Sequence, residues 1–160
     1  MTPEQAARGY IESFSEHDVG RALAHWARGG RQHVRGQIDT VAPDGVREQI
    51  EALIAAAPDF RFEVVGTVSE GERCALHWRL RGHFNGSARL YGVRPTGDRL
   101  ELEGVDIFTV RDGLIVANDA FSDSMEFTRQ IGMMPPRGSR RERFFTALFN
   151  LRPRRRRRRG

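Results

Sequence analysis

Residues 100–123, LELEGVDIFTVRDGLIVANDAFSD, carry the pattern that decides the fold. Up to Val110 the residues alternate with the period of two that is typical of a strand with one buried face. Arg111-Asp112-Gly113 then predicts a tight hairpin turn, and a second strand is expected over 114–123. The buried face of the first strand is predicted to carry Leu100, Leu102, Gly104, Asp106, Phe108 and Val110.

The same period extends toward the N-terminus. Phe60, Phe62 and Val64 alternate with charged residues, and residues 69–72 read as a turn. The run that follows places Cys74, Leu76, Trp78 and Leu80 on one face. With a glycine-rich loop over 82–97, these segments predict a four-stranded meander.

The N-terminal third has the helical period instead. Helices are predicted over 3–16, over 18–29 with Asp18 as the cap and Gly29-Gly30 at the end, and over 46–57. The second of these helices includes Trp26. A short strand is expected over 32–38 and a short helix over 124–131. Three helices followed by a meander predict an α+β fold, with the helices on one face of a curved antiparallel sheet.

Charge divides the chain into two parts. Residues 137–160 hold 11 of the 26 basic residues and one of the 21 acidic ones, a local charge of +10. Residues 1–136 therefore carry −5, so we expect a mildly acidic domain over 1–136 and a basic segment over 137–160. Because Cys74 is the only cysteine, an intramolecular disulfide and two-cysteine zinc patterns are excluded. The N-terminal residues show no secretory signal, and a cytoplasmic location is expected.

The basic segment predicts a capped amphipathic helix over 139–151, with Ser139 followed three residues later by Glu142. Phe144, Phe145, Leu148, Phe149 and Leu151 gather mainly on one side, and six consecutive arginines follow at 154–159. Such a helix can lie on an anionic membrane surface, which would make the protein membrane-peripheral. It can instead pack on the sheet or on a partner subunit. Sequence-independent nucleic-acid binding is the least favoured of the three.

Several short stretches resemble the SnoaL-like polyketide cyclases, which have the cone-shaped fold named after nuclear transport factor two. They are Ala24-His25-Trp26, Pro58–Phe62, Arg94–Gly97, Val105–Phe108, Asp112–Val116 and Arg129–Pro135. The resemblance covers roughly residues 4–135 and implies a sheet bent around a deep apolar cavity. It also implies acid/base catalysis by a carboxylate in the cavity wall, with no cofactor.

In SnoaL-like cyclases the general base is the aspartate of a Trp-Asp-x-Phe run on the last strand. Asp119 matches it, with Phe121 in place, only if one extra residue is allowed before Asp123. Ungapped matching puts Ala120 at that position. A β-bulge near the strand end could reconcile the two alignments. Alternatively, Asp119 points outward and Asp123 caps the helix that begins at Ser124.

Two more residues are candidates for the catalytic site. Asp106 lies on the apolar stripe of its strand, where an acid is costly unless it is paired or functional. We expect it to contact the ligand or to be held by His25, Tyr10 or Trp26. His33 is a candidate proton carrier at the cavity mouth because histidine titrates near neutral pH, although a lone histidine is more often a surface residue.

The apolar wall of the substrate site is predicted to contain Tyr10, Phe14, Trp26, Leu53, Phe62, Trp78, Phe108 and Phe121, with Leu76 in the same layer. The histidines and acids show no metal-ligand spacing. Serine-elbow, phosphate-loop and dinucleotide motifs are missing as well. No metal is therefore expected, and the lack of a cofactor, which the resemblance implies, agrees with these missing motifs.

The sequence leaves three functions open. The first is a cyclase or isomerase that acts on a small apolar, polyketide-like carbonyl compound, with Asp119 as the base and Asp106 and His33 polarising or positioning the substrate. The second is a non-catalytic module that binds an apolar ligand or forms a homodimer through the open sheet face. An epoxide hydrolase, which pairs Asp with Arg in its pocket, is a weaker third.

Overall fold

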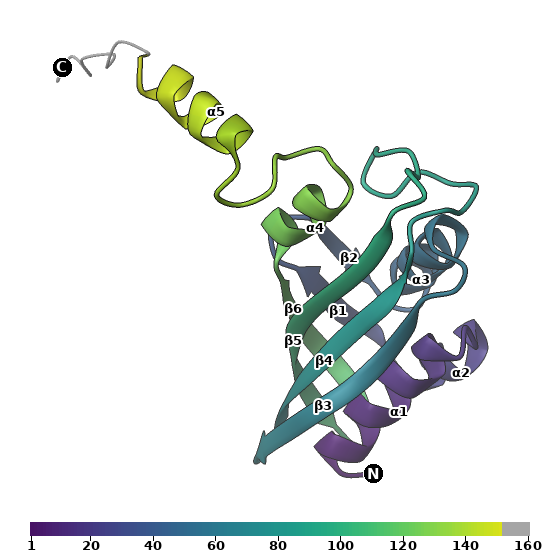
Figure 1. The fold of residues 1–160 in the computed structure, drawn as a ribbon. Helices are drawn as coiled ribbons and strands as arrows, with labels where there is room; N and C mark the ends of the chain where they lie inside the picture. The colour runs from purple at the N-terminus through teal and green to yellow at the C-terminus, as the bar shows by residue number, and fades with distance from the viewer. Residues whose placement is uncertain (152–160) are drawn as a thin grey trace, which may run out of the picture.

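The computed structural model describes residues 1–151, and Figure 1 shows their arrangement. A single six-stranded sheet has the order β2-β1-β6-β5-β4-β3. The strands are β1 (Trp26–Val34), β2 (Ile38–Val41), β3 (Arg61–Glu70), β4 (Arg73–His83), β5 (Arg99–Arg111) and β6 (Leu114–Ser122). Strands β3 to β6 form the meander predicted from the alternating pattern.

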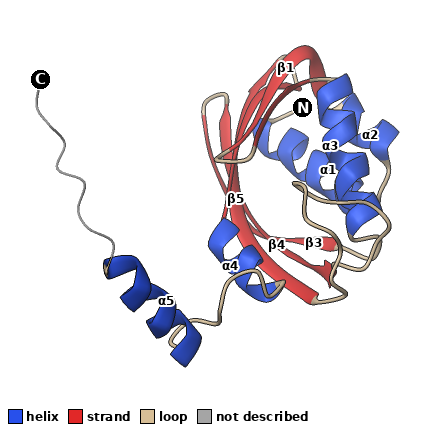
Figure 2. Ribbon diagram, turned by 90° about the horizontal axis from the view of Figure 1, so that it is seen from above, coloured by secondary structure: helices blue, strands red, loops and turns tan. Residues whose placement is uncertain are grey.

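The sheet curves around three helices, α1 (Pro3–Ser15), α2 (Val19–Ala24) and α3 (Asp44–Ala56). Figure 2 shows the strands bent along one side, with these helices on their concave face. The core lies between the two layers. It includes Ile11 of α1, Ile50 of α3 and Leu76 of β4, all almost fully buried. The α+β fold and the cone-like curvature are therefore confirmed.

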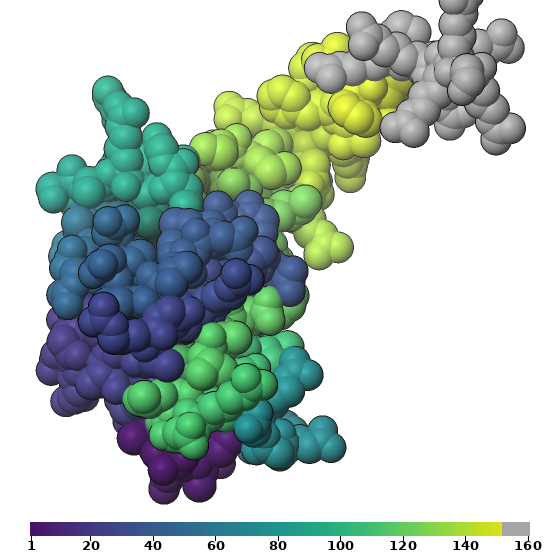
Figure 3. Space-filling view, turned by 180° about the vertical axis from the view of Figure 1, so that it is seen from behind, coloured from purple at the N-terminus to yellow at the C-terminus, as the bar shows by residue number. Residues whose placement is uncertain are grey.

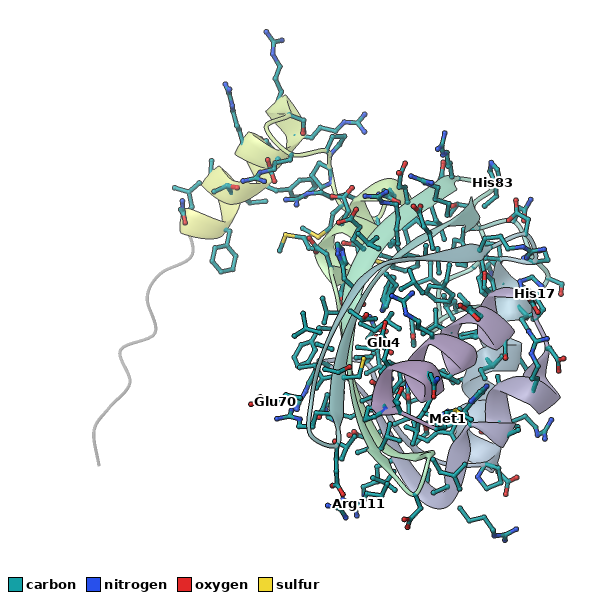
Figure 4. The ribbon with its side chains drawn as sticks, turned by 90° about the horizontal axis from the view of Figure 1, so that it is seen from below. Met1, Glu4, His17, Glu70, His83 and Arg111 are labelled. Carbon is teal, nitrogen blue, oxygen red and sulfur yellow. The ribbon has the colours of Figure 1, made fainter. Side chains whose placement is uncertain are left out.

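Helix α1 begins where the sequence provides a cap. Thr2 and Gln5 form a reciprocal capping box, and Pro3 occupies the first helical position. Its two ends are fixed to β3 and the segment before it. The Glu4 carboxylate accepts a hydrogen bond from Thr67 at 2.7 Å, and the His17 ring lies 4.5 Å from the Phe60 ring. Figure 4 shows the labelled Glu4 and His17 side chains toward opposite ends of this helix.

The sheet is mixed, because β1 pairs with β6 in the parallel direction. The expectation of a purely antiparallel sheet is wrong at this one pairing. Strand β1 also begins earlier than expected, since Trp26 is its first residue, whereas the sequence pattern placed Trp26 in the second helix. Gly29 has a φ of +79°, a value that favours glycine, and its N–H donates to the Ala42 carbonyl.

The β5–β6 hairpin turns through Asp112 and Gly113, both with positive φ, as a type I′ turn requires. Directly after the turn the register shifts. Val110 pairs with Ile115 but Thr109 pairs with Ala117, so Val116 is an extra residue in β6. A β-bulge of this kind inverts the inward and outward positions of all later residues of the strand.

Two helices follow the sheet, α4 (Ser124–Gln130) and α5 (Arg140–Asn150). The predicted caps are present: Asp123 accepts from the Met125 and Glu126 amides, and Ser139 accepts from the Glu142 amide. Figure 3 shows α5 in yellow, projecting away from the body of the protein. Within residues 1–151 no helix is long and apolar enough to cross a membrane.

Candidate functional site

A cavity of about 120 Å³ lies between the helices and the concave face of the sheet. Most of its surface is apolar. The lining residues come from α1, α3, α4, the inner face of the sheet and the loop before β5. Of the residues that were predicted to form an apolar wall, those that line the cavity are Tyr10, Phe14, Leu53, Phe62 and Trp78.

Asp106 is the buried carboxylate in this cavity. It lies on β5 and is 5% exposed, with Leu100, Phe108 and Val110 on the same side of the strand. Its Oδ1 accepts a hydrogen bond from Trp78 Nε1 at 2.8 Å, and its Oδ2 accepts one from Asn118 Nδ2 at 2.6 Å. Asp106 therefore lines the cavity, as its place on the apolar stripe predicted. Its hydrogen-bond partners are Trp78 and Asn118 and not the residues expected from the sequence, His25, Tyr10 or Trp26.

Burial controls the acidity of Asp106. Loss of hydration penalises the charged form and raises the pKa of this carboxyl to about 6, although the hydrogen bonds from Asn118 and Trp78 act in the opposite direction. No arginine lines the cavity among residues 1–151, so no cation offsets the loss of hydration there. A carboxylate with a pKa near 6 is largely ionised at neutral pH and more basic than an exposed one.

Trp78 is held in place to reach Asp106. Its ring makes an edge contact with Phe62, with the centroids 5.2 Å apart. Gly104 lies opposite it on β5. A β-carbon at Gly104 would lie 2.2 Å from the indole ring, so the glycine provides the space in which the ring lies.

Two buried amides behind Asp106 were not predicted as site residues. Asn118 of β6 is fully buried, and its Nδ2 also lies 3.1 Å from Gln32 Oε1 on β1, so Asp106 and Gln32 share one amide donor. Asn118 Oδ1 is buried and has no hydrogen-bond partner within the described residues. The sequence offered no signal for these contacts, because they depend on the β1–β6 and β5–β6 registers.

Tyr10 is a second buried ionisable residue of the cavity wall. The side chain is 2% exposed, and its ring packs edge-on against Trp26 and Phe108. Burial raises the pKa of Tyr10, and the negative charge of Asp106 raises it further, although an interaction with the Trp26 side chain acts in the opposite direction. The phenol therefore stays protonated and remains a hydrogen-bond donor.

Asp119 does not line the cavity. Asn118 and Ala120 face inward, and the Asp119 side chain between them is 37% exposed and 2.6 Å from Arg35. The prediction of Asp119 as a cavity base is wrong in this structure. The bulge at Val116 is the reason, since it reverses the alternation that starts from the buried Ile115.

His33 also lies outside the cavity. Its neighbours Gln32 and Val34 line the cavity, whereas the His33 ring points to the other face and contacts Asp39 on β2. His33 and Asp119 are register partners in the parallel pair, so both border a hollow on the outer face of the sheet. The position at the cavity mouth that the sequence suggested for His33 is not found.

Three predicted wall residues occupy other positions. Trp26 and Phe108 are buried behind Tyr10 and belong to the core rather than to the lining. Phe121 is 42% exposed, because it shares the outward direction of Asp119, and Arg35 lies over its ring. Cavity residues that the sequence did not identify include Gln32, Gln49, Leu80, Leu90, Tyr91, Leu100, Leu102, Ala120, Ser122 and Phe127.

Residues 1–151 contain no group of three or more histidine, cysteine, aspartate or glutamate side chains that could hold a metal ion. Among the residues that line the cavity, Asp106 supplies a buried carboxyl group and Tyr10 a buried phenol.

Comparison with known proteins gives a family match over most of the chain. The sequence profile of the SnoaL-like polyketide cyclases matches residues 4–131, which end at the start of the segment that leads to α5. No curated protein sequence matches the chain.

Solved structures share the fold. IdmH from Streptomyces antibioticus, a proposed polyketide cyclase, is 26% identical, with a TM-score of 0.69 over 82% of this chain and 99% of its own. A proposed SnoaL-like polyketide cyclase from Jannaschia sp. CCS1 is 19% identical, with a TM-score of 0.71 over 83% and 95%. AclR from Streptomyces galilaeus, a proposed hydroxylase, is 19% identical, with a TM-score of 0.70 over 84% and 87%. The two relatives that are less than 25% identical show the fold alone.

Proposed function

Because this chain belongs to the SnoaL-like polyketide cyclase family, we propose that it is an acid/base enzyme for a small apolar carbonyl compound. In this proposal Asp106, and not Asp119, removes a proton from the carbon next to the carbonyl. The observation that carries the proposal is the burial of Asp106 in the wall of an apolar cavity. The cavity volume favours a substrate part of about one small ring.

The proposed step begins with the ionised Asp106. A carboxylate oxygen takes the proton, the C–H bond breaks, and the electron pair moves onto the carbonyl oxygen as an enolate. Tyr10 donates a hydrogen bond to that oxygen, where the charge develops. The enolate carbon then attacks a second carbonyl of the same substrate and closes a ring, and the oxygen of that carbonyl takes the proton back from Asp106 as it becomes a hydroxyl. Alternatively, Asp106 returns the proton to another carbon and moves a double bond.

Trp78 and Asn118 act as positioning residues. Their two hydrogen bonds fix the orientation of the carboxylate, and both favour the ionised form. The remaining lone pairs of Asp106 stay available to a substrate, because each oxygen accepts one side-chain hydrogen bond and a carboxylate oxygen can accept more.

The test uses β-tetralone, a small apolar ketone with acidic α-protons, in deuterated buffer. NMR would follow the exchange of its α-protons with wild type, Asp106→Asn and Asp119→Asn. We expect Asp106→Asn to slow the protein-dependent exchange by at least about 100-fold, the usual contribution of a general base. The wild-type rate should rise with pH through an apparent pKa of about 6.

The matched control is Asp119→Asn, which removes the same charge from the outer face and should leave the rate within about twofold. If Asp106→Asn exchanges β-tetralone as fast as wild type, the assigned base is wrong. If wild type binds β-tetralone and does not accelerate its exchange, the non-catalytic ligand-binding module becomes the better account. An epoxide hydrolase of this fold pairs an aspartate with an arginine in its pocket. No arginine of residues 1–151 lines the cavity, so this third function is not favoured.

A further inference from the structure

Helix α5 exposes apolar side chains that the domain does not cover. Phe144 is 65% exposed, Leu148 is 53% exposed and Leu151, directly after the helix, is 79% exposed. They lie at positions i, i+4 and i+7 and therefore share one side of the helix. Phe145, also exposed, adjoins them, with its ring 6.1 Å from that of Phe144. No residue of α5 is buried.

The attachment of α5 to the domain is polar. The Glu142 carboxylate accepts a hydrogen bond from Arg129 of α4 at 2.7 Å, and this ion pair is the more buried part of the helix. Figures 1 and 3 show the helix extending away from the sheet and from α1 to α3. The ion pair holds the first turn of α5 while the apolar side remains in solvent.

Positive charge surrounds that apolar side. Arg140, Arg141 and Arg143 lie in the first turns of α5. In the sequence, Arg152 and six consecutive arginines follow the helix. Apolar side chains between clusters of arginine are the pattern of a helix that lies in the interface of an anionic membrane. The acidic balance of residues 1–136 means that this attraction belongs to the C-terminal segment alone.

Other occupants fit the segment less well. Pairing of two α5 helices would bring two segments of +10 charge together, and an 11-residue helix is short compared with the roughly 800 Å² per partner of a stable interface. Nucleic acid would neutralise the arginines, but phosphate contacts leave the aliphatic Leu148 and Leu151 in water. A lipid surface takes up both the charge and the apolar side.

We propose that α5 binds the surface of an anionic phospholipid membrane. Phe144, Leu148 and Leu151 enter the boundary between headgroups and acyl chains, and the arginines contact lipid phosphates. Because α4 contributes Ser124 and Phe127 to the cavity lining, this binding would hold the cavity near the membrane surface. The proposal does not depend on the catalytic role of Asp106.

The test is co-flotation of the full chain with vesicles of phosphatidylcholine alone or mixed with phosphatidylglycerol. We expect binding to the mixed vesicles only, weakened by added salt. The double variant Phe144→Ser/Leu148→Ser should weaken binding about 30-fold or more. The triple variant Arg140→Gln/Arg141→Gln/Arg143→Gln should weaken it about 100-fold, roughly fivefold for each charge.

The matched control is Thr146→Ala/Asn150→Ala on the other side of the same helix, which should bind like wild type. Because α5 is exposed, all variants should keep the wild-type thermal unfolding midpoint. Lack of flotation with the mixed vesicles at low salt would overturn the proposal. Undiminished flotation of Phe144→Ser/Leu148→Ser would also overturn it, since charge alone would then explain binding. Self-association that this double variant abolishes, without vesicle binding, would assign the surface to a second copy of the chain.

Discussion

The inner and outer faces of β5 and β6 place similar residues in opposite environments. On the inner face, Asp106 is 5% exposed and is bonded to two neutral donors, Trp78 and Asn118. On the outer face of the neighbouring strand, Asp119 is 37% exposed and paired with Arg35. The phenylalanines differ in the same way, with Phe108 fully buried and Phe121 42% exposed.

The difference shows that the face of the sheet to which a side chain points decides its environment more than the residue type does. Each pair consists of identical residues at most 13 positions apart. In a regular strand, Asp119 and Phe121 would face the same side of the sheet as the buried Ile115. The extra residue Val116 shifts the alternation, so that both face the opposite side. A comparison of the two faces is therefore a direct test of the register.

The largest expected difference between the two faces is in stability. Phe108→Ala should lower the free energy of unfolding by about 3–5 kcal/mol, because a large buried side chain is removed from the core. Phe121→Ala should cost less than about 1 kcal/mol. Urea unfolding of both variants measures the difference, and equal losses would mean that the β6 register is wrong.

The next effect is the pH dependence that Asp106 gives to stability. Its pKa is raised from 3.8 to about 6 on folding, so between these values the folded protein binds more protons than the unfolded chain. Stability from this group is therefore present at low pH and lost as the pH rises to about 6. The loss should approach about 3 kcal/mol.

Asp106→Asn should remove this pH dependence, whereas Asp119→Asn should leave it unchanged. The measurement is urea unfolding of the three proteins at several pH values between about 3 and about 8, a range that includes both pKa values of Asp106. The relevant quantity is the difference between wild type and each variant, because it cancels the contributions of the other acids. An identical pH profile for wild type and Asp106→Asn would mean that Asp106 is not desolvated.

A smaller effect should follow from the amide behind Asp106. Asn118→Ala removes a 2.6 Å hydrogen bond to the carboxylate and should raise its pKa by about one unit, since that bond favours the ionised form. Carboxyl titration by NMR measures this shift. The control is Arg35→Gln, which acts on the outer face, and a downward shift or no shift in Asn118→Ala would contradict the geometry.

The smallest effect belongs to the outer ion pair. Arg35→Gln and Asp119→Asn should each change the free energy of unfolding by less than about 1 kcal/mol, because exposed ion pairs contribute little. A double-mutant cycle measures the coupling between the two side chains. A coupling of several kcal/mol would show that this face is covered by something that excludes water.

Much of the fold followed from the sequence pattern. The alternation at Cys74, Leu76, Trp78 and Leu80 correctly predicted a strand with one buried face, and Asp112-Gly113 correctly predicted the hairpin. The caps at Asp18, Asp123 and Ser139 were also correct. These signals are local, because they depend on residues within one turn or one strand.

The site was harder to predict because it depends on several strands. Asp106 was identifiable, since an acid on an apolar stripe is visible in one strand alone. Its partners Trp78 and Asn118 belong to β4 and β6, and their pairing requires two registers. Asp119 was assigned to the cavity because it matches the aspartate of the Trp-Asp-x-Phe run, with Phe121 in place. Such a match does not show to which side of the sheet the residue points, and the bulge at Val116 turns Asp119 outward.

The sequence by itself determined the α+β class, the family, the buried acid at Asp106 and the amphipathic basic segment, because each depends on spacing or charge along the chain. The tertiary structure decided which acid faces the cavity, which amide and indole hold it, and that the apolar side of α5 is uncovered. These properties arise from contacts between strands and helices that are distant in sequence. The free energy of burial depends on those contacts, and no local pattern records them.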